Sequence, residues 1–178
     1  MHESVMSFGR FFLQAADCAG KRVLEVGSQN VNGSLRSHIE SFSPSQYIGV
    51  DFQPGNGVDQ VVPAEDLVKH FGLDSFDLVV STEMLEHCKD WKKSIQAIFD
   101  VCKADGIILM TARGPGCGYH AYPHDYWRFT VADMTKVFDK NKILYLQDDP
   151  QGPGFLSKIQ KTAPALFTDF EVMPITQS

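Results

Sequence analysis

Apolar residues along this chain alternate between short uninterrupted runs and helical repeats, the pattern of parallel strands joined by crossover helices. The short runs predict strands at residues 22–26, 47–51, 58–62, 76–81 and 107–110. The helical repeats predict helices at residues 4–18, 34–40, 65–71, 91–102 and 130–138. The run 76–81 is almost wholly apolar, as expected of a central strand covered on both faces. The pattern therefore predicts an α/β fold.

The C-terminal part of the chain departs from this alternation. Residues 143–147 and 154–159 are separated by a turn sequence rich in Asp, Gly and Pro, so they predict an antiparallel pair at the sheet edge. Residues 162–178 carry no strong pattern and are either a tail or an additional edge segment. No repeat or linker divides the chain, so we expect one domain over residues 1–178, with its first helix within residues 1–20.

Composition and charge exclude several classes of protein. With 178 residues, 43% of them hydrophobic and 21% charged, the chain is long enough for one well-buried core. A net charge of −6 disfavours binding to nucleic acid. The chain has neither a basic cluster suited to a membrane surface nor an apolar run long enough to span a membrane. The four cysteines lie far apart without a C-x-x-C pair, which predicts reduced thiols. We therefore expect a cytoplasmic protein.

Candidate binding chemistry begins where the first two predicted strands end. The first strand carries Glu25 and runs into Gly27 and Ser28 before a helix. Glycine lets the backbone approach a ligand closely, and serine supplies a donor where the helix begins. The second strand ends in Asp51, at the place where doubly wound folds hold the ribose hydroxyls of an adenosine. The alternative role for Asp51 is a helix cap or a solvated strand end.

The residues after Gly27 separate two classes of adenosine ligand. The dinucleotide fingerprint G-x-G-x-x-G requires glycines two and five residues later, where this chain has Gln29 and Asn32. Without a close glycine pair, a pyrophosphate has poor access to the helix N-terminus. A sulfonium amino acid carries no phosphate and needs acceptors for its amino group, which Glu25 helps to provide. The loop therefore favours S-adenosylmethionine over a dinucleotide.

Six segments together carry a family resemblance: 23–28, 32–36, 47–51, 76–80, 84–87 and the Asp-Tyr-Trp-Arg-Phe-Thr run 125–130. They resemble class I S-adenosylmethionine-dependent methyltransferases, and within these the small type 11-like bacterial and phage group. The resemblance covers roughly residues 20–160. It implies a Rossmann-like seven-stranded sheet, mostly parallel with the last strand antiparallel and helices on both faces. It also implies S-adenosyl-L-methionine as the cofactor and S-adenosyl-L-homocysteine as its product.

The same resemblance implies where the methionine and adenosine parts of the cofactor lie. Glu25, Gly27 and Ser28 should border the methionine part. Asp51 should hold the ribose, and Phe52 should pack against the adenine.

The remaining implied cofactor residues follow the third and fourth strands. Many relatives carry an Asp-Ala pair that contacts the adenine edge, whereas this chain has Pro63 and Ala64, so Glu65 or a backbone group should replace the missing carboxylate. Ser81 ends the fourth strand and should point its carbonyl at the methionine amino group. The implied set ends with the neighbours Thr82 and Glu83.

The loop 119–129 is rich in histidine, charged and aromatic residues. It follows the fifth strand, at the edge of the sheet where such folds bind ligands. His124 and Asp125 are candidates for binding or deprotonating an acceptor hydroxyl, because histidine titrates near neutrality. A structural role for both is equally open. His120 and His124 have the spacing of a helical metal pair, but Pro123 between them disfavours a helix, so no metal is expected.

Other conspicuous residues are interpreted as structural. Trp127 and Phe129 should anchor the loop in the core, with Arg128 paired to a structural acid. Glu86 and His87 follow the fourth strand in a Leu-Glu-His segment at a helix start. That position favours packing or capping over a role as a base.

These observations predict an S-adenosylmethionine-dependent methyltransferase that acts at an oxygen of a small-molecule or glycan-like acceptor. An amino-directed enzyme of the adenine or glutamine type would carry Asn/Asp-Pro-Pro-Tyr after the fourth strand, where this chain has Ser-Thr-Glu-Met at 81–84. Two alternatives stay open. One is a nicotinamide-dependent oxidoreductase on a similar sheet, and the other is a non-catalytic module that binds S-adenosylmethionine.

Overall fold

The structure, a computed structural model, describes residues 2–167 and 170–175. The main sheet contains β1 (Arg22–Val26), β2 (Gln46–Asp51), β3 (Gln60–Val61), β4 (Phe76–Thr82), β5 (Cys102–Arg113), β7 (Lys142–Asp148) and β8 (Gly154–Gln160). The α-helices are α1 (Glu3–Phe12), α2 (Ala15–Cys18), α3 (Arg36–Glu40), α4 (Leu67–Phe71), α5 (Trp91–Val101) and α6 (Val131–Val137). Two short 3₁₀ turns, η1 (Ala64–Asp66) and η2 (Leu85–His87), and a small sheet of β6 (Trp127–Arg128) and β9 (Met173–Pro174) complete the fold.

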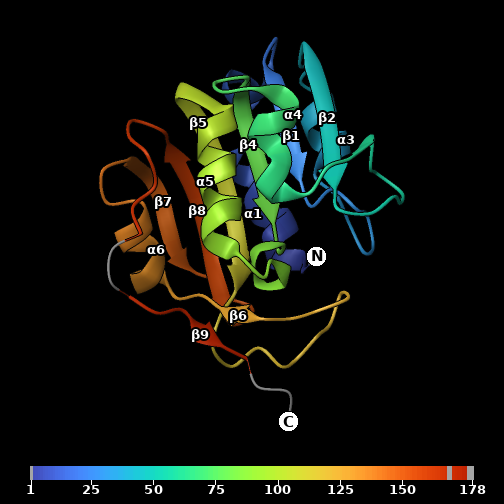
Figure 1. Cartoon of the computed structure of the whole chain (residues 1–178). Helices are drawn as coiled ribbons and strands as arrows, with labels where there is room; N and C mark the ends of the chain where they lie inside the picture. The colour runs from blue at the N-terminus through green and yellow to red at the C-terminus, as the bar shows by residue number, and fades with distance from the viewer. Residues whose placement is uncertain (1, 168–169, 176–178) are drawn as a thin grey trace.

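The seven strands of the main sheet lie in the order β3-β2-β1-β4-β5-β8-β7 (Figure 1). Strands β3, β2, β1, β4 and β5 are parallel, whereas β8 runs antiparallel to both of its neighbours, β5 and β7. The predicted α/β fold, with its mostly parallel sheet and its antiparallel C-terminal pair at the edge, is therefore confirmed.

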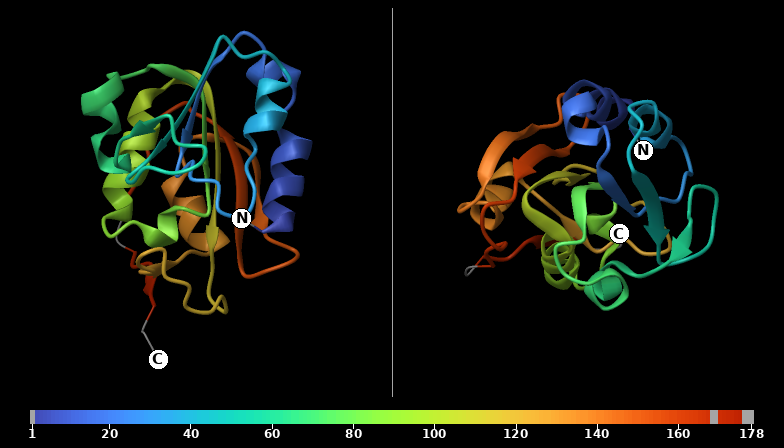
Figure 2. Two further views of the ribbon diagram at one scale, coloured as in Figure 1. Left: turned by 90° about the vertical axis from the view of Figure 1, so that its right-hand side faces the viewer. Right: turned by 90° about the horizontal axis from the view of Figure 1, so that it is seen from above.

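Helices cover both faces of this sheet (Figure 2). The face covered by α4, α5 and α6 contains the larger apolar cluster, and the face covered by α1, α2 and α3 contains the smaller one. Side chains alternate between these faces along each strand. In β1, Leu24 belongs to the first cluster and Val23 to the second, so Glu25 points to the side of α1 and α3.

Several predicted elements differ from the structure in extent, and two of them show the physical reason clearly. The single helix expected over 4–18 is divided into α1 and α2, because Asp17 accepts a hydrogen bond from the Gln14 backbone N–H at 2.9 Å and starts a new helix there. The strand expected over 58–62 is only two residues long, since β3 pairs with β2 at the sheet edge. Local capping and edge position, rather than hydrophobic period, set these limits.

The segment after β8 packs against the molecule. Phe167 and Phe170 contact the Trp91 ring, with centroids 5.8 and 6.1 Å away. Val172 is buried, and β9 pairs antiparallel with β6 (Figure 1). The described part of 162–178 therefore packs against the domain, and its strand β9 belongs to the small sheet with β6 and not to an edge of the main sheet. Residues 168–169 and 176–178 lie outside the described residues.

In the part of the chain that the structure describes, no helix is both long and apolar enough to cross a bilayer.

Candidate active site

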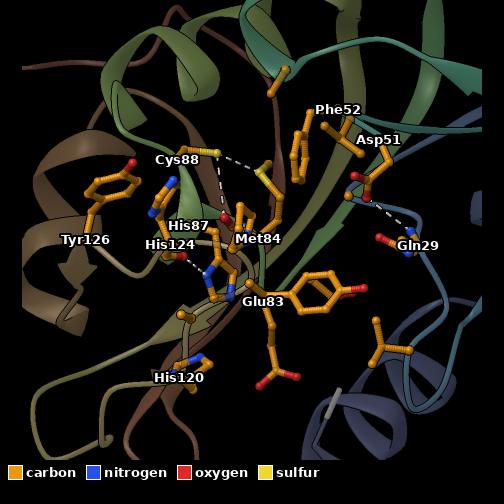
Figure 3. Close-up of a pocket in the computed structure, with 18 of the residues that line it drawn as sticks. Gln29, Asp51, Phe52, Glu83, Met84, His87, Cys88, His120, His124 and Tyr126 are labelled. Carbon is orange, nitrogen blue, oxygen red and sulfur yellow. Dashed lines mark hydrogen bonds between the residues drawn. The ribbon is translucent and has the colours of Figure 1, made fainter. Parts of the chain in front are cut away.

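A cavity of about 460 Å³ opens beyond the carboxyl ends of β1, β2 and β4 (Figure 3). Its walls are the loops after these strands, the turns η1 and η2, and residues 120–124 and 126. This is the edge at which open parallel sheets bind ligands, and the volume lies in the range of small-molecule sites.

The turn out of β1 forms one wall of the cavity and depends on Gly27. This residue has φ of 79°, a left-handed conformation that favours glycine. A Cβ at Gly27 would also lie 2.6 Å from Cγ of Met84, which lines the cavity as well. The Gly27 N–H donates to the Val50 carbonyl at 2.9 Å and holds the turn against β2. Glycine here therefore sets the path of the loop.

Asp51 ends β2 and lies at the cavity wall with little exposure. Its two carboxylate oxygens accept backbone hydrogen bonds from Gln29 at 3.2 Å and from Gln53 at 3.4 Å. Burial raises the pKa of Asp51, and the backbone hydrogen bonds oppose that shift. A carboxylate offers about four acceptor positions, so Asp51 can still accept from ligand hydroxyls.

An apolar surface adjoins this acid. The Phe52 side chain is 49% exposed although it is aromatic, and it lies beside Asp51 (Figure 3). Val62 and Ala64 line the same part of the cavity. An acid that can accept from two hydroxyls beside an exposed ring is suited to an adenosine.

Glu83 and a buried arginine define the floor at the other end of the cavity. Glu83 has φ of 51°, uncommon for a residue with a side chain. Its carboxylate pairs with Arg113 Nε at 2.7 Å and contacts the His2 side chain. Arg113 is fully buried and also pairs with Asp149 at 3.1 Å. Sequence reasoning missed Arg113 and His2, although an arginine that ends an apolar strand is itself a signal of a buried ion pair.

The loop 119–129 folds onto η2 through backbone groups. The Tyr126 N–H donates to the Glu86 carbonyl at 2.8 Å, and His87 Nδ1 donates to the His124 carbonyl at 2.6 Å. Trp127 Nε1 donates to the Cys88 carbonyl at 2.9 Å. His87, His120 and His124 consequently gather at one end of the cavity (Figure 3).

Most of the predicted cofactor residues meet at this cavity. Its lining includes Gly27, Asp51, Phe52, Ala64, Glu65, Thr82 and Glu83. The other three, Glu25, Ser28 and Ser81, are buried outside the lining. Glu25 accepts a hydrogen bond from the Tyr47 hydroxyl behind β1, and burial raises its pKa from 4.5 to about 7.

The two predicted catalytic residues are separated by the fold. His124 lines the cavity, whereas Asp125 is buried behind it. Both carboxylate oxygens of Asp125 accept from the Arg128 guanidinium at 2.6 Å, and one accepts from the His120 backbone N–H at 2.9 Å. Burial alone would raise the pKa of Asp125, but Arg128 outweighs it and lowers that pKa. Asp125 is thus the structural acid expected as the partner of Arg128.

Other cavity residues were not among the predicted cofactor or catalytic residues, although the sequence predicts other roles for some of them. Among them are His2, Gln29, Cys88, Tyr122 and Tyr126, together with Met84, His87 and His120. The Glu86 carboxylate is the main cause that raises the pKa of His120, whose Nε2 lies 3.9 Å from Glu86 Oε1. The chain thus brings Glu86 and His87 next to His120, and the packing or capping role expected for both stays a prediction.

Comparison with known proteins places this geometry in a family. A family model described as a methyltransferase domain matches residues 1–142. Among curated proteins, no match is found.

Solved structures share the fold at low sequence identity. An S-adenosylmethionine-dependent methyltransferase from Mesorhizobium loti is similar with a TM-score of 0.66 and 15% identity, over 89% of this chain and 98% of that one. A 1,6-didemethyltoxoflavin-N1-methyltransferase from Burkholderia thailandensis, solved with its substrate and S-adenosylhomocysteine, has a TM-score of 0.71 and 15% identity over 90% and 80% of the two chains.

A third similar structure is the carbon methyltransferase of CurJ, with a TM-score of 0.60 and 15% identity over 86% of this chain and 51% of that one. Enzymes of this fold thus act on different acceptor atoms, and the fold alone does not fix the acceptor. The type 11-like subgroup and the significance of segment 125–130 stay predictions. The chain belongs to the methyltransferase-domain family, as its sequence predicts, and has the fold of S-adenosylmethionine-dependent methyltransferases.

Proposed function

We propose that this protein transfers the methyl group of S-adenosylmethionine to an oxygen of a small-molecule or glycan-like acceptor. One observation carries the proposal: Asp51 and Phe52, which suit an adenosine, line the same cavity as His124. Donor and acceptor would therefore meet within one site.

The residues present fit the cofactor. Asp51 has acceptor capacity for the two ribose hydroxyls, and the exposed face of Phe52 suits the adenine ring. The hydroxyl of Thr82 is buried at the lining and has no hydrogen-bond partner in the described part of the chain. Because buried polar groups are normally paired, Thr82 has an open position for a polar atom of the methionine part.

We divide the predicted cofactor residues into those that would touch the cofactor and those that would hold the cavity wall in place. We assign direct contacts to the seven residues of the lining, with Gly27 and Thr82 on the methionine part and Ala64 and Glu65 near the adenine edge. Glu83 holds the floor through Arg113. Glu25, Ser28 and Ser81 would act from behind the wall, by fixing the strand ends that carry the contacting groups.

The chemistry requires positioning and the removal of one proton. When bound, S-adenosylmethionine supplies a methyl group already activated by a positively charged sulfur. The protein's task is therefore to hold an acceptor hydroxyl in line with that methyl group. His124 is the proposed general base: it takes the hydroxyl proton as the new oxygen–carbon bond forms and the sulfur–carbon bond breaks. The Tyr126 ring lies beside the His124 ring, with centroids 5.6 Å apart.

The acceptor end of the cavity suits a hydroxylated ring. Its lining mixes His120 and His124 with Tyr122, Pro123 and Tyr126. Flat apolar surfaces accompanied by a few polar groups bind and orient small ring compounds. This composition supports a small-molecule or glycan-like acceptor.

The cofactor assignment predicts that S-adenosylhomocysteine raises the melting temperature and that Asp51→Ala removes most of the shift. Loss of two charge-assisted hydrogen bonds should weaken binding about 10- to 100-fold. Asp139→Ala, at an exposed position far from the cavity, serves as the matched control. Calorimetric titration gives the affinities. The absence of binding by the wild-type chain, or saturable binding of NADH in its place, would refute the assignment.

The acceptor assignment predicts that His124→Gln lowers kcat by about 10²- to 10⁴-fold on a hydroxyl acceptor, the range for loss of a general base. S-adenosylhomocysteine affinity should stay at the wild-type value, since His124 is placed at the acceptor end. The measurement is methyl transfer to a panel of hydroxyl, amine and carbon acceptors. Methylation confined to amines would contradict oxygen transfer while leaving the cofactor assignment intact. Cofactor binding without methylation of any acceptor would favour a binding module.

A further inference from the structure

Three side chains of ligand type meet at the histidine-lined end of the cavity, beside η2. One carboxylate oxygen of Glu86 and one ring nitrogen each of His87 and His120 all lie within 4.8 Å of one another. We propose that these residues bind one divalent metal ion of the zinc type, with an open coordination position that faces the cavity.

The Glu86 carboxylate is buried and incompletely paired. Its side chain is fully buried, and neither carboxylate oxygen has a hydrogen-bond partner in the described part of the chain. The His120 Nε2 atom is 3.9 Å from Oε1, beyond the reach of a direct hydrogen bond. A buried carboxylate that makes no hydrogen bond and reaches an imidazole only at 3.9 Å is incompletely paired, which is costly. A metal ion between Glu86 and the two imidazoles would satisfy it.

In both histidines one ring nitrogen is engaged with an oxygen acceptor, which leaves the other as the candidate ligand. His87 Nδ1 lies 2.6 Å from the His124 carbonyl oxygen, which can only accept, so Nδ1 carries the proton. His120 Nδ1 lies 3.0 Å from the Gly118 carbonyl and 3.3 Å from Asp125 Oδ2, with the same consequence. The Nε2 atoms are left as the ligating atoms. Metal-binding histidines almost always donate their other ring N–H to a carbonyl or a carboxylate in this way.

This arrangement gives Asp125 a positioning role. Its carboxylate lies behind the His120 ring and is itself held by the Arg128 fork. A carboxylate behind a ligating imidazole fixes the ring and strengthens it as a ligand. Asp125 would thus act on the cavity through His120, although it does not line the cavity.

The ligand set favours zinc or a similar late first-row ion. Two imidazoles and one carboxylate suit such ions, whereas calcium and magnesium prefer oxygen ligands alone. Ligands of a tetrahedral ion at about 2.0–2.1 Å are about 3.3 Å apart, so small side-chain rotations would complete the set. His120 can rotate because its side chain is 39% exposed. Any proton on its Nε2 would be displaced by the metal.

The location of the metal site beside His124 indicates a role in binding the acceptor. This part of the inference rests on the proposed function. Three protein ligands leave a fourth position, and the two histidine ligands line the cavity at the acceptor end together with His124. A hydroxyl of the acceptor bound there would be oriented toward the methyl group. Its pKa would fall, so His124 could remove the proton more readily.

The test is titration of the full chain, freed of metal by a chelator, with Co²⁺ as a spectroscopic probe for zinc. We expect one Co²⁺ per chain, with the visible absorption of nitrogen- and oxygen-ligated cobalt, and its displacement by Zn²⁺. Glu86→Gln and His120→Ala should each weaken binding by at least about 100-fold, and Asp125→Asn by about 10- to 100-fold. His70→Ala, which removes an exposed histidine of α4, should bind as the wild type does.

The controls separate this proposal from folding and from the proposed function. Melting temperatures measured in chelator show whether each variant folds. If Glu86→Gln does not fold, His120→Ala still tests the site, because His120 lies on an exposed loop. No cobalt binding by the wild type, or equal binding by the Glu86 and His120 variants, overturns the metal site. If S-adenosylhomocysteine raises the melting temperature of the wild type but the wild type binds no metal, the metal site is overturned and the proposed function is not. Metal binding without any cofactor shift contradicts the proposed function and leaves the site standing.

Discussion

At the scale of single residues, Glu25 illustrates how burial changes the chemistry of an acid. It lies one residue before the end of β1, and the alternation of this strand directs it away from the cavity and toward Tyr47. Burial raises its pKa from 4.5 to about 7, and the hydrogen bond from Tyr47 only partly opposes this. A shift of that size makes the folded state hold a proton that the unfolded state releases.

Glu25 should therefore make stability depend on pH between 4.5 and about 7. Below this window the acid is protonated in both states and its stabilising contribution is fully present. As the pH rises through the window, the unfolded state ionises first, so about 3 kcal/mol of unfolding free energy is lost. Urea unfolding at pH 4.5 and pH 8 measures this loss.

The matched variant for this prediction is Glu25→Gln, which keeps an acceptor for the Tyr47 hydroxyl and removes the titration. The difference in stability between the wild type and this variant should change across the window and stay constant above it. A difference that does not depend on pH would show that Glu25 is ionised in the folded protein.

At the scale of elements, the pairing of β6 with β9 ties the end of the described chain to the loop that closes the cavity. Trp127 and Arg128 face Pro174 and Met173 across this pair. Just beyond it, the Ile175 N–H donates to the Tyr126 carbonyl at 2.8 Å. Tyr126 lines the cavity, so a segment far along the chain helps to hold the acceptor end in place.

Replacing Ile175 with proline removes that donor and should speed amide hydrogen exchange in residues 126–128. Exchange in β4 should not change, because the main sheet is left intact. The control is Ile175→Ala, which keeps the backbone N–H and alters only the side chain. Equal exchange in the two variants would show that the hydrogen bond contributes nothing to the order of the loop.

At the scale of the whole molecule, the four cysteines are free and report on the packing of its different parts. Cys18 and Cys102 are fully buried, one in each apolar cluster. Burial raises the pKa of Cys18 to about 11 and those of Cys88 and Cys102 to about 12. Cys117 is half-buried on the loop after β5, and burial raises its pKa as well.

We therefore expect iodoacetamide at pH 8 to modify Cys117 first in the folded protein. Cys18 and Cys102 should react only as the whole domain unfolds, because the thiolate is the reactive form and both side chains are inaccessible. Mass spectrometry after labelling with and without urea measures the order. Cys117→Ser should remove the fast phase alone. Modification of Cys102 at the rate of Cys117 would contradict this description of the core.

Much of the fold could be predicted from the sequence because its signals are local. Runs such as 76–80 and the helical repeat 91–102 identify strands and helices without reference to the rest of the chain. Asp51 could be placed in a ligand site for a related reason, since the carboxyl ends of parallel strands meet at one edge. The division of the first helix at Gln14 escaped prediction, because one side-chain cap outweighed the hydrophobic period there.

The sequence by itself determined the α/β class and the strand ends that carry the cofactor candidates, because both depend on periodicity and position along the chain. It also indicated the family, through the resemblance of six short segments to methyltransferases. Tertiary structure decided which candidates share a cavity. It turned Glu25 and Asp125 away from the lining and brought Glu86, His87 and His120 together. The physical reason is that direction and contact depend on the pleat of β1 and on how loop 119–129 lies across η2. Neither is encoded in the spacing of the residues concerned.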